Sequence, residues 1–352
     1  MKQLYTIILS VFFYSTTVLG QQMPLLSEYM HSPSLINPAM VGWEDLTAIS
    51  AAYRHQWTGM KGNPITFMLN FRHFDEKRNM AFGGGFTHDQ TGPTSFTGIN
   101  LQYAYHLKFG SEKKGQDKRH RLAIGLSLSG NQYRLDGSKL QYNDANDPLI
   151  VGNNQFRILP DAGAGLFYYN DLYYIGFSVP QMISMNVKFE SDNALSNIQR
   201  IAHFYINAGV KIELRNKKKD GLTKKSLKEK VKHMLVPSLW FRFAPNSPLN
   251  FYGNLRYVWN QVLGFGVGGS TDGTLAFDIN VHIKKRFRVG YAFSLPVSNL
   301  SQHLGTNHEI MLTYIFGSNG KGWMFEAAEQ QIKLGKKAKK KKAKKATDKT
   351  AK

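Results

Sequence analysis

The sequence predicts an all-β protein: a 14-stranded antiparallel transmembrane β-barrel of the outer membrane, with an N-terminal hatch-like segment and a disordered basic C-terminal tail. Apolar and polar residues alternate with period two along most of the 352-residue chain, which is typical of strands with one apolar face. No apolar run of about 18 residues follows the first twenty positions, so a membrane protein with this sequence must cross as a closed barrel. The alternating segments number fourteen, and single-chain bacterial outer-membrane barrels have an even number of strands.

Residues 1–20 are predicted to be a secretory signal peptide. Lys2 is the only early charge, a mostly apolar run follows it, and the small residue Gly20 closes the segment; this order is typical of a cleaved leader. An uncleaved membrane anchor is the alternative, but the apolar run is short and leads directly into turn-forming residues. The chain has no cysteine, so an exported fold must rely on burial and backbone pairing rather than on disulfides.

Residues 21–45 match neither helix nor strand periodicity, and we predict a hatch that folds back into the barrel mouth. Asn37 suits the N-cap of a short helix and Pro38 suits its first position. Prolines farther upstream disfavour strand pairing. The candidate hatch residues are Asn37, Pro38, Ala39 and Trp43.

Residues 46–316 are predicted to form the barrel. In residues 98–109, apolar or aromatic side chains occupy the odd positions and small or polar side chains the even positions, and residues 276–283 alternate in the same way. The strands are expected at residues 46–57, 64–74, 80–89, 95–109, 119–134, 161–169, 172–179, 200–213, 234–243, 249–259, 261–269, 274–283, 287–295 and 307–316. Aromatic residues near strand ends are candidates for the girdles at the two membrane interfaces: Trp57, Phe74, Phe109, Tyr168, Tyr169, Tyr257, Trp259 and Phe316.

The basic residues are sorted by loop. If the mature N-terminus is periplasmic, then the loops after even-numbered strands and the C-terminus are periplasmic too, and these regions hold 34 of the 45 lysines and arginines. A soluble β-sandwich or propeller has no reason to separate charge in this way. We therefore expect an outer-membrane barrel of a Gram-negative envelope with both mature termini in the periplasm. The candidate periplasmic basic contacts are Lys217, Lys218, Lys219, Lys224, Lys225, Lys339, Lys340, Lys341 and Lys342.

Residues 317–352 form the lysine-rich tail. Blocks of like charge are disordered and act by electrostatic capture. Nucleic acid is not an expected partner in the periplasm. Phospholipid headgroups of the outer membrane, peptidoglycan carboxylates and an acidic face of a periplasmic machine are the candidate partners, and a solvated tail without a partner is the alternative.

Several charged residues lie within predicted strands, on the polar face. Charges inside a membrane are costly unless they pair or meet water. The barrel interior is therefore either a hydrated channel or a filled lumen in which these groups brace one another, and we favour the filled lumen. The candidate lumen network comprises Arg54, Arg72, Arg242, Arg256, Asp278 and Glu309.

Motifs of catalysis and metal binding are weak, so we expect no enzyme, no catalytic residue, no metal and no cofactor. Residues 264–269 satisfy G-x-G-x-x-G, but a turn and another strand follow instead of a helix, so packing inside the barrel explains these glycines better. Residues 125–129 lack the second glycine of a nucleophile elbow. His303 and His308 lack a third ligand for zinc.

Four segments together resemble the PorP/SprF family of outer-membrane barrels in the type IX secretion and gliding machinery of Bacteroidetes-type bacteria. They are YMHSPSLINPAMVG (29–42), YRHQWTGMKGNP (53–64), residues 160–180 and NHEIMLTYIF (307–316). The resemblance implies a barrel that receives the C-terminal domain of a secreted surface adhesin and contacts periplasmic components of the machinery. The loops expected to hold the exported partner are Asp136 to Leu159, Gln181 to Asn197 and Val297 to Thr306.

The Asn-Pro-Ala step at residues 37–39 is also similar to the hatch of FadL-like transport barrels. An uptake channel for a small hydrophobic ligand is therefore the alternative function. It predicts a ligand-sized apolar cavity beneath the hatch.

Overall fold

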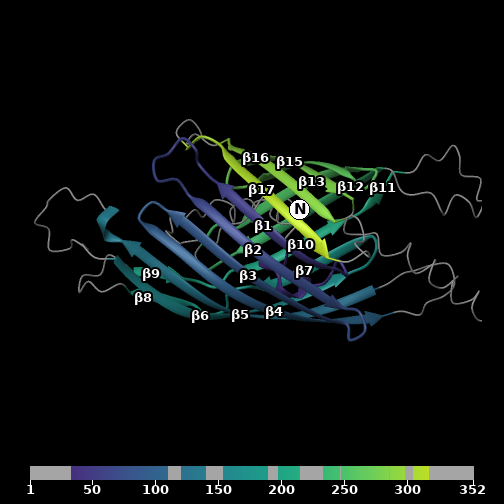
Figure 1. The fold of residues 1–352 in the computed structure, drawn as a ribbon, viewed down its shortest axis with the longest axis horizontal. Coiled ribbons are helices and arrows are strands. Elements are labelled where there is room, and N and C mark those ends of the chain that lie inside the picture. Colours follow the sequence, from purple (N-terminus) through teal and green to yellow (C-terminus); the bar gives the residue numbers. More distant parts are fainter. Residues whose placement is uncertain are drawn as a thin grey trace, which may run out of the picture.

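The structure is a computed structural model, and it describes residues 33–109, 120–139, 154–188, 197–214, 233–245, 247–284, 286–297 and 304–316. The described chain forms a closed antiparallel barrel of fourteen strands (Figure 1), which confirms the predicted fold class. The wall strands are β1 (Thr47–His55), β2 (Ile65–Asp75), β3 (Met80–Thr91), β4 (Thr94–Phe109), β5 (His120–Asp136), β6 (Asn154–Tyr169), β7 (Tyr173–Val179), β10 (Phe204–Val210), β12 (His233–Phe243), β13 (Asn250–Trp259), β14 (Leu263–Ser270), β15 (Thr274–Ile283), β16 (Phe287–Pro296) and β17 (Asn307–Phe316). The ring closes where β1 pairs with β17.

Six short elements complete the described chain. Three are 3-10 helices: η2 (Pro33–Leu35), η3 (Pro38–Met40) and η4 (Gly137–Lys139). β8 (Met185–Lys188) and β9 (Asn197–Arg200) form a two-stranded sheet of their own, and β11 (Ile212–Glu213) pairs with β12 beyond the end of β10. No helix in these ranges has the length and apolarity needed to cross a membrane.

The wall has one buried and one exposed face, as the alternation predicts. In β2, Asn70 and Arg72 are buried and point into the barrel, whereas Phe67 and Phe71 are exposed on the outside. The exposed large apolar residues of the other strands follow the same alternation. The outer surface is therefore an apolar band suited to lipid, and the interior is mixed polar and aromatic.

The two ends of the barrel differ. We call the end at which β1 begins and β17 ends the terminal end, and the opposite end the far end. Short turns join β2 to β3 and β13 to β14 at the terminal end, whereas β3 to β4 and β14 to β15 turn at the far end. Strands β4, β5 and β6 have 16, 17 and 16 residues, but β7 and β10 have 7 each. The wall is therefore much taller on the β4–β6 side.

Strand β6 corrects one predicted boundary. We expected this strand to begin at residue 161 and the preceding residues to belong to a loop, but it begins at Asn154. Every residue from Asn154 to Pro160 has a partner on β5. The expected boundary lay next to Pro160, which the strand accommodates without ending.

A second correction concerns the region between β7 and β12. The single strand expected at residues 200–213 is divided into β10 and β11, and a β8–β9 hairpin lies partly within the expected loop 181–197. The register that pairs Gly209 with Ser238 and Ile212 with Leu235 places Pro237 opposite the break. Proline has no N–H to donate to a ladder, so the interruption coincides with the one residue of β12 that cannot donate.

The aromatic residues predicted at the interfaces divide between the two faces. Trp259, Phe109 and Phe316 are exposed on the outer surface, as girdle residues should be. Phe74 and Tyr169 are buried instead and point inward. Their alternation with exposed neighbours puts them on the interior face, and both contact groups inside the barrel.

Candidate functional site

The barrel interior contains the chain that precedes β1. We call Pro33–Leu46 the luminal segment; it includes η2 and η3, and nearly all its side chains are buried. Its short helix η3 begins where the sequence pattern indicates, with Asn37 as the N-cap and Pro38 in the first position. The segment contacts the inner faces of strands on opposite sides of the barrel, so it fills the middle of the lumen.

Asn37 joins the luminal segment to the wall. Its side-chain Oδ1 accepts a hydrogen bond from Ala39 N at 2.9 Å, which caps η3. Its Nδ2 donates to the main-chain oxygens of Leu166 at 3.1 Å and Phe177 at 3.4 Å. A single buried amide therefore satisfies one helix N–H and bonds to two neighbouring strands.

Three inward-facing glycines of β5, β6 and β7 leave space for Asn37 and Ala39 of the luminal segment. A Cβ on Gly125 would overlap with the backbone of Ala39, and a Cβ on Gly165 would overlap with the Asn37 amide oxygen. A Cβ on Gly176 would lie 2.8 Å from the Asn37 Nδ2 atom. We call these three residues the glycine recess. Sequence reasoning missed it because the three glycines meet only when the strands are placed side by side.

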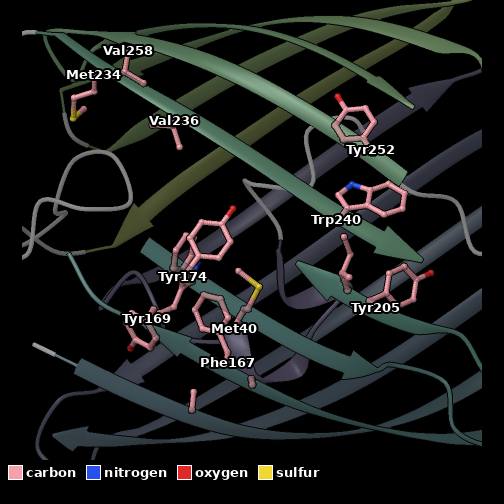
Figure 2. Close-up of a cluster of buried hydrophobic side chains, with 14 residues drawn as sticks. Met40, Phe167, Tyr169, Tyr174, Tyr205, Met234, Val236, Trp240, Tyr252 and Val258 are labelled. Carbon is pink, nitrogen blue, oxygen red and sulfur yellow. The ribbon is translucent and has the colours of Figure 1, made fainter. Parts of the chain in front are cut away.

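An aromatic cluster surrounds the next part of the luminal segment. The Trp43 ring lies edge-on to Phe167 and Tyr174, with ring centroids 5.5 and 5.6 Å away. Figure 2 shows Met40 beside Phe167 and Tyr174, with Trp240 and Tyr252 farther along the interior. The whole buried cluster comprises Ile36, Ala39, Met40, Trp43, Ala123, Phe167, Tyr169, Tyr174, Tyr205, Met234, Val236, Trp240, Tyr252 and Val258.

Glu44 binds two arginines of the wall. Arg72 Nε donates to Glu44 Oε2 at 3.0 Å, and Arg288 Nη1 bonds to Glu44 Oε1. All three side chains are almost fully buried. Burial raises the pKa of the Glu44 carboxyl, but Arg288 and Arg72 lower it by more, so its pKa lies below the ordinary glutamate value. The carboxylate is therefore charged at neutral pH and holds both guanidiniums.

Asp45 forms a second ion pair, with Arg121 of β5. Both guanidinium nitrogens Nη1 and Nη2 bond to the carboxylate, the latter at 3.0 Å. The Arg121 guanidinium also donates to the Tyr169 hydroxyl at 3.2 Å and lies over the Phe74 ring. A two-pronged pair of this kind fixes orientation as well as distance.

Backbone oxygens of the luminal segment are satisfied by side chains of the wall. Gln102 Nε2 donates to Ser34 O at 2.8 Å, and Ser178 Oγ donates to Ile36 O at 2.9 Å. The His106 ring lies between two groups, with Nε2 2.8 Å from Val41 O and Nδ1 2.8 Å from the Tyr169 hydroxyl. Irregular backbone needs such partners where water is excluded.

The six residues of the predicted lumen network take part in contacts on several strands of the wall. Arg54 pairs with Glu309 (Nε to Oε1, 3.0 Å), and Arg256 pairs with Asp278 (Nη2 to Oδ1, 2.8 Å). Arg72 binds Glu44 of the luminal segment instead. Arg242 is half-buried beside Tyr205, its register partner on β10. The prediction missed Glu44, Asp45, Arg121 and Arg288, although two adjacent acids at the end of the hatch-like segment are a visible signal.

The glycines of the G-x-G-x-x-G run give space to neighbouring side chains. A Cβ on Gly266 would overlap with the carboxylate of Asp278, and a Cβ on Gly268 would overlap with the hydroxyl of Tyr252. Asn254 supports the same carboxylate, donating to Asp278 Oδ2 at 3.1 Å. The packing explanation therefore fits this motif.

A small cavity of about 40 Å³ lies on the far-end side of the luminal segment. Its lining is mixed polar and apolar, and it comes from the luminal segment, from β3 to β5 and from the residues after β7. The lining residues are Ser34, Leu35, Pro38, Thr87, Phe96, Gly98, Ile99, Asn100, Gln102, Ser127, Ser129, Asn131, Pro180 and Gln181. Over the described ranges, no group of three or more His, Asp or Glu side chains could hold a metal ion.

The candidate basic contacts lie outside the described residues: Lys217, Lys218, Lys219, Lys224, Lys225 and Lys339 to Lys342. Only the ends of the flanking strands are described. β4 ends and β5 begins at the terminal end, β11 ends and β12 begins there, and β17 ends there. Among the described residues, Lys77, Arg78 and Arg286 add to this basic end.

Known proteins resemble this chain at two levels. A family model, type IX secretion system membrane protein PorP/SprF, matches residues 18–314. No curated protein sequence matches. Solved structures that the chain resembles include the KdgM porin, at 10% identity and a TM-score of 0.34 over 77% of this chain and 99% of that one.

Two other solved structures are similar at the same level. One is the outer membrane protein Omp33 of Acinetobacter baumannii, at 8% identity and a TM-score of 0.39 over 77% of this chain and 98% of that one. The other is the toluene transporter TodX of Pseudomonas putida, at 8% identity and a TM-score of 0.38 over 80% and 92%. The family model spans most of the sequence and includes both the luminal segment and the wall, so the chain belongs to the PorP/SprF family of type IX secretion system membrane proteins.

Proposed function

We propose that this outer-membrane barrel docks a secreted surface protein, the C-terminal domain of an adhesin, at its far end and contacts periplasmic components of the type IX machinery at its terminal end. The observation that carries the proposal is the filled lumen. A barrel whose interior is occupied by its own chain, held by buried ion pairs and by the Asn37 amide, suits docking rather than passage.

The luminal segment acts as the hatch in this proposal, with Asn37, Pro38, Ala39 and Trp43 as its central residues. Asn37 and Trp43 make its principal contacts with the recess and with the aromatic cluster. Deleting residues 22–43 is expected to raise the conductance of the purified barrel in planar bilayers, or to destabilise it. A deletion barrel that stays stable and closed would contradict the role.

The orientation proposed here puts both mature termini in the periplasm. The support is the separation of charge, because the basic connections leave the wall at the terminal end. There they would contact periplasmic machinery, outer-membrane lipid headgroups or peptidoglycan. Since the chain has no cysteine, single cysteines at Asp272 (far end) and Glu76 (terminal end) give a direct test. A membrane-impermeant thiol reagent on intact cells should label the first and not the second.

The docking proposal is tested by affinity purification from outer membranes. A co-purifying fragment of a secreted adhesin, together with loss of that adhesin from the surface of a deletion strain, is the expected result. Unchanged surface display in the deletion strain would overturn the proposal.

An uptake channel for a small hydrophobic ligand is the other candidate. Ligand sites usually enclose about 300–1,000 Å³ with a mostly apolar lining, whereas the cavity beside the luminal segment is much smaller and its lining is mixed polar and apolar. The same purification separates the two functions, because bound lipid without an adhesin fragment would support uptake.

A further inference from the structure

The tall side of the wall leaves one strand edge open. All sixteen residues of β6 pair with β5, but β7 pairs only with Ala164 to Tyr169. None of the described strands pairs with Asn154 to Pro160 on the β7 side. The β8–β9 hairpin, which follows β7 in the chain, forms its own sheet and does not extend the wall here.

The backbone groups that face the open edge can be identified. Ala162 O accepts a hydrogen bond from Met182 N at 2.8 Å, and Asn170 N donates to Tyr173 O at 3.0 Å. Both partners belong to the β7 side, and successive residues of a strand turn their N–H and C=O groups to opposite sides. The even-numbered residues of β6 therefore turn their N–H and C=O groups to the β7 side, so Phe156 and Ile158 each present an N–H at the open edge. The Phe156 C=O accepts a hydrogen bond from Arg157 Nη1 at 3.4 Å.

Pro160 fits the same assignment. Proline within a sheet is confined to positions whose N–H side has no ladder partner. Pro160 lies inside a sixteen-residue strand and is even-numbered, so its nitrogen faces the open edge and costs no bond to β5. It also limits pairing along the edge, because natural edge strands use proline to discourage uncontrolled pairing.

The height of the open edge suits a partner outside the membrane. Tyr168 lies near the terminal end of β6, and about ten residues of a tilted strand cross the hydrocarbon layer. Phe156 therefore lies beyond that layer on the far side. Phe156 and Ile158 are 56% and 66% exposed on the outer face, so the edge combines backbone N–H groups with apolar side chains at alternate positions.

We propose that the edge of β6 at residues 154–160 binds an extended strand of the exported partner by backbone pairing. The proposal rests on the proposed docking function and names the surface and the chemistry of that docking. Main-chain bonds would supply most of the affinity and tolerate varied partner sequences, while Phe156 and Ile158 would contact alternate side chains of the added strand. Pro160 would set one limit of the paired stretch.

The test compares two substitutions at one position in the native strain. Phe156→Pro removes the edge N–H and leaves the β5 ladder intact, as Pro160 already does, whereas Phe156→Ala removes only the side chain. The proline variant is expected to lower the amount of co-purifying adhesin by about tenfold, as the loss of one or two hydrogen bonds implies, and the alanine variant by less than about threefold. Heat-modifiable mobility on gels checks that each barrel is folded.

A photo-crosslinking residue at Ile158, in an otherwise unaltered chain, gives a second measurement if the proline variant does not fold. An adduct with the C-terminal domain of an exported surface protein supports the proposal. An adduct with residues 185–188 of the same chain overturns it, because the hairpin then closes the edge. The proposal is also overturned if the Phe156→Pro variant co-purifies with as much adhesin as the Phe156→Ala variant. Failure of the proposed docking function gives a different result, because a strain that lacks the barrel would then still display the adhesin on its surface.

Discussion

The luminal segment is held in different ways on two sides of the barrel. On the β5–β7 side, Asn37 and Ala39 sit in the glycine recess, where the Ala39 backbone lies against Gly125 and the Asn37 amide lies against Gly165 and Gly176. On the side where β1 meets β17, Glu44 reaches Arg72 of β2 and Arg288 of β16. The first attachment depends on the absence of side chains, and the second depends on charge.

The difference predicts different sensitivities. At Gly125 the neighbouring atoms of the luminal segment are main chain and cannot move aside as a flexible side chain could. Ion pairs can respond to pH, and their loss leaves a buried charge rather than a clash. Breaking the recess should therefore displace the segment outright, whereas breaking the ion pairs should weaken its attachment.

The largest effect is expected for Gly125→Val. The new side chain would occupy the space of the Ala39 backbone, so the segment cannot seat, and we expect a loss of about 3 kcal/mol or more in the free energy of unfolding. Urea unfolding of the barrel in lipid vesicles measures the loss, and conductance reports displacement of the segment. Gly130→Val is the matched control, since a Cβ at Gly130 meets nothing within 4 Å. Equal stability of the two variants would show that the glycine recess does not hold the luminal segment.

Glu44→Gln should have the next largest effect. It leaves Arg72 and Arg288 buried without their shared countercharge, and removing one partner of a buried pair costs about 3–5 kcal/mol before relaxation. The amide can still accept a hydrogen bond, so we expect the lower part of this range. Unfolding in urea gives the value, with the exposed Glu76→Gln as control. A variant as stable as the control would show that the two arginines do not depend on Glu44.

Asn37→Ala should be milder. It removes the cap of η3 and two bonds to strand oxygens, and loss of an N-cap costs about 1–2 kcal/mol, but it introduces no clash in the recess. The same unfolding assay should place it between Glu44→Gln and wild type. A loss as large as that of Gly125→Val would mean that the amide, rather than the glycines, determines the fit.

The smallest effect on stability is expected from lowering the pH. The Glu44 pKa is lowered in the folded protein from its ordinary value of 4.5, so its contribution is present above that value and is lost as the pH falls through the folded pKa. Conductance and unfolding free energy should therefore stay constant from neutral pH to about pH 5, with loosening only at lower pH. Glu44→Gln should abolish this acid response. A response centred near neutral pH would point to another group.

The barrel could be predicted from the sequence because each strand shows its own alternation of apolar and polar residues. Alternation in residues 98–109 depends only on neighbours along the chain, so all fourteen wall strands were found. The predicted start of β6 was wrong because proline usually marks the end of a strand. Pro160 is tolerated because its nitrogen faces the open edge of β6.

The interior was less predictable because its contacts join distant residues. Asn37 was found, since an N-cap is a local pattern. Arg72 was assigned to the lumen, but its partner Glu44 is not on any strand, so strand patterns could not identify it. Gly125, Gly165 and Gly176 look like ordinary strand glycines until β5, β6 and β7 are aligned.

The position of Glu44 has a consequence for assembly. Its two arginines belong to β2 and β16, which flank the first and last strands, and the β1–β17 junction itself carries the Arg54–Glu309 pair and the contact between Ser50 and Thr313. Strand β17 is made last, so the second arginine reaches Glu44 only when the ring closes. Seating of the luminal segment is therefore linked to closure of the ring, because an unclosed barrel would hold Arg288 away from Glu44.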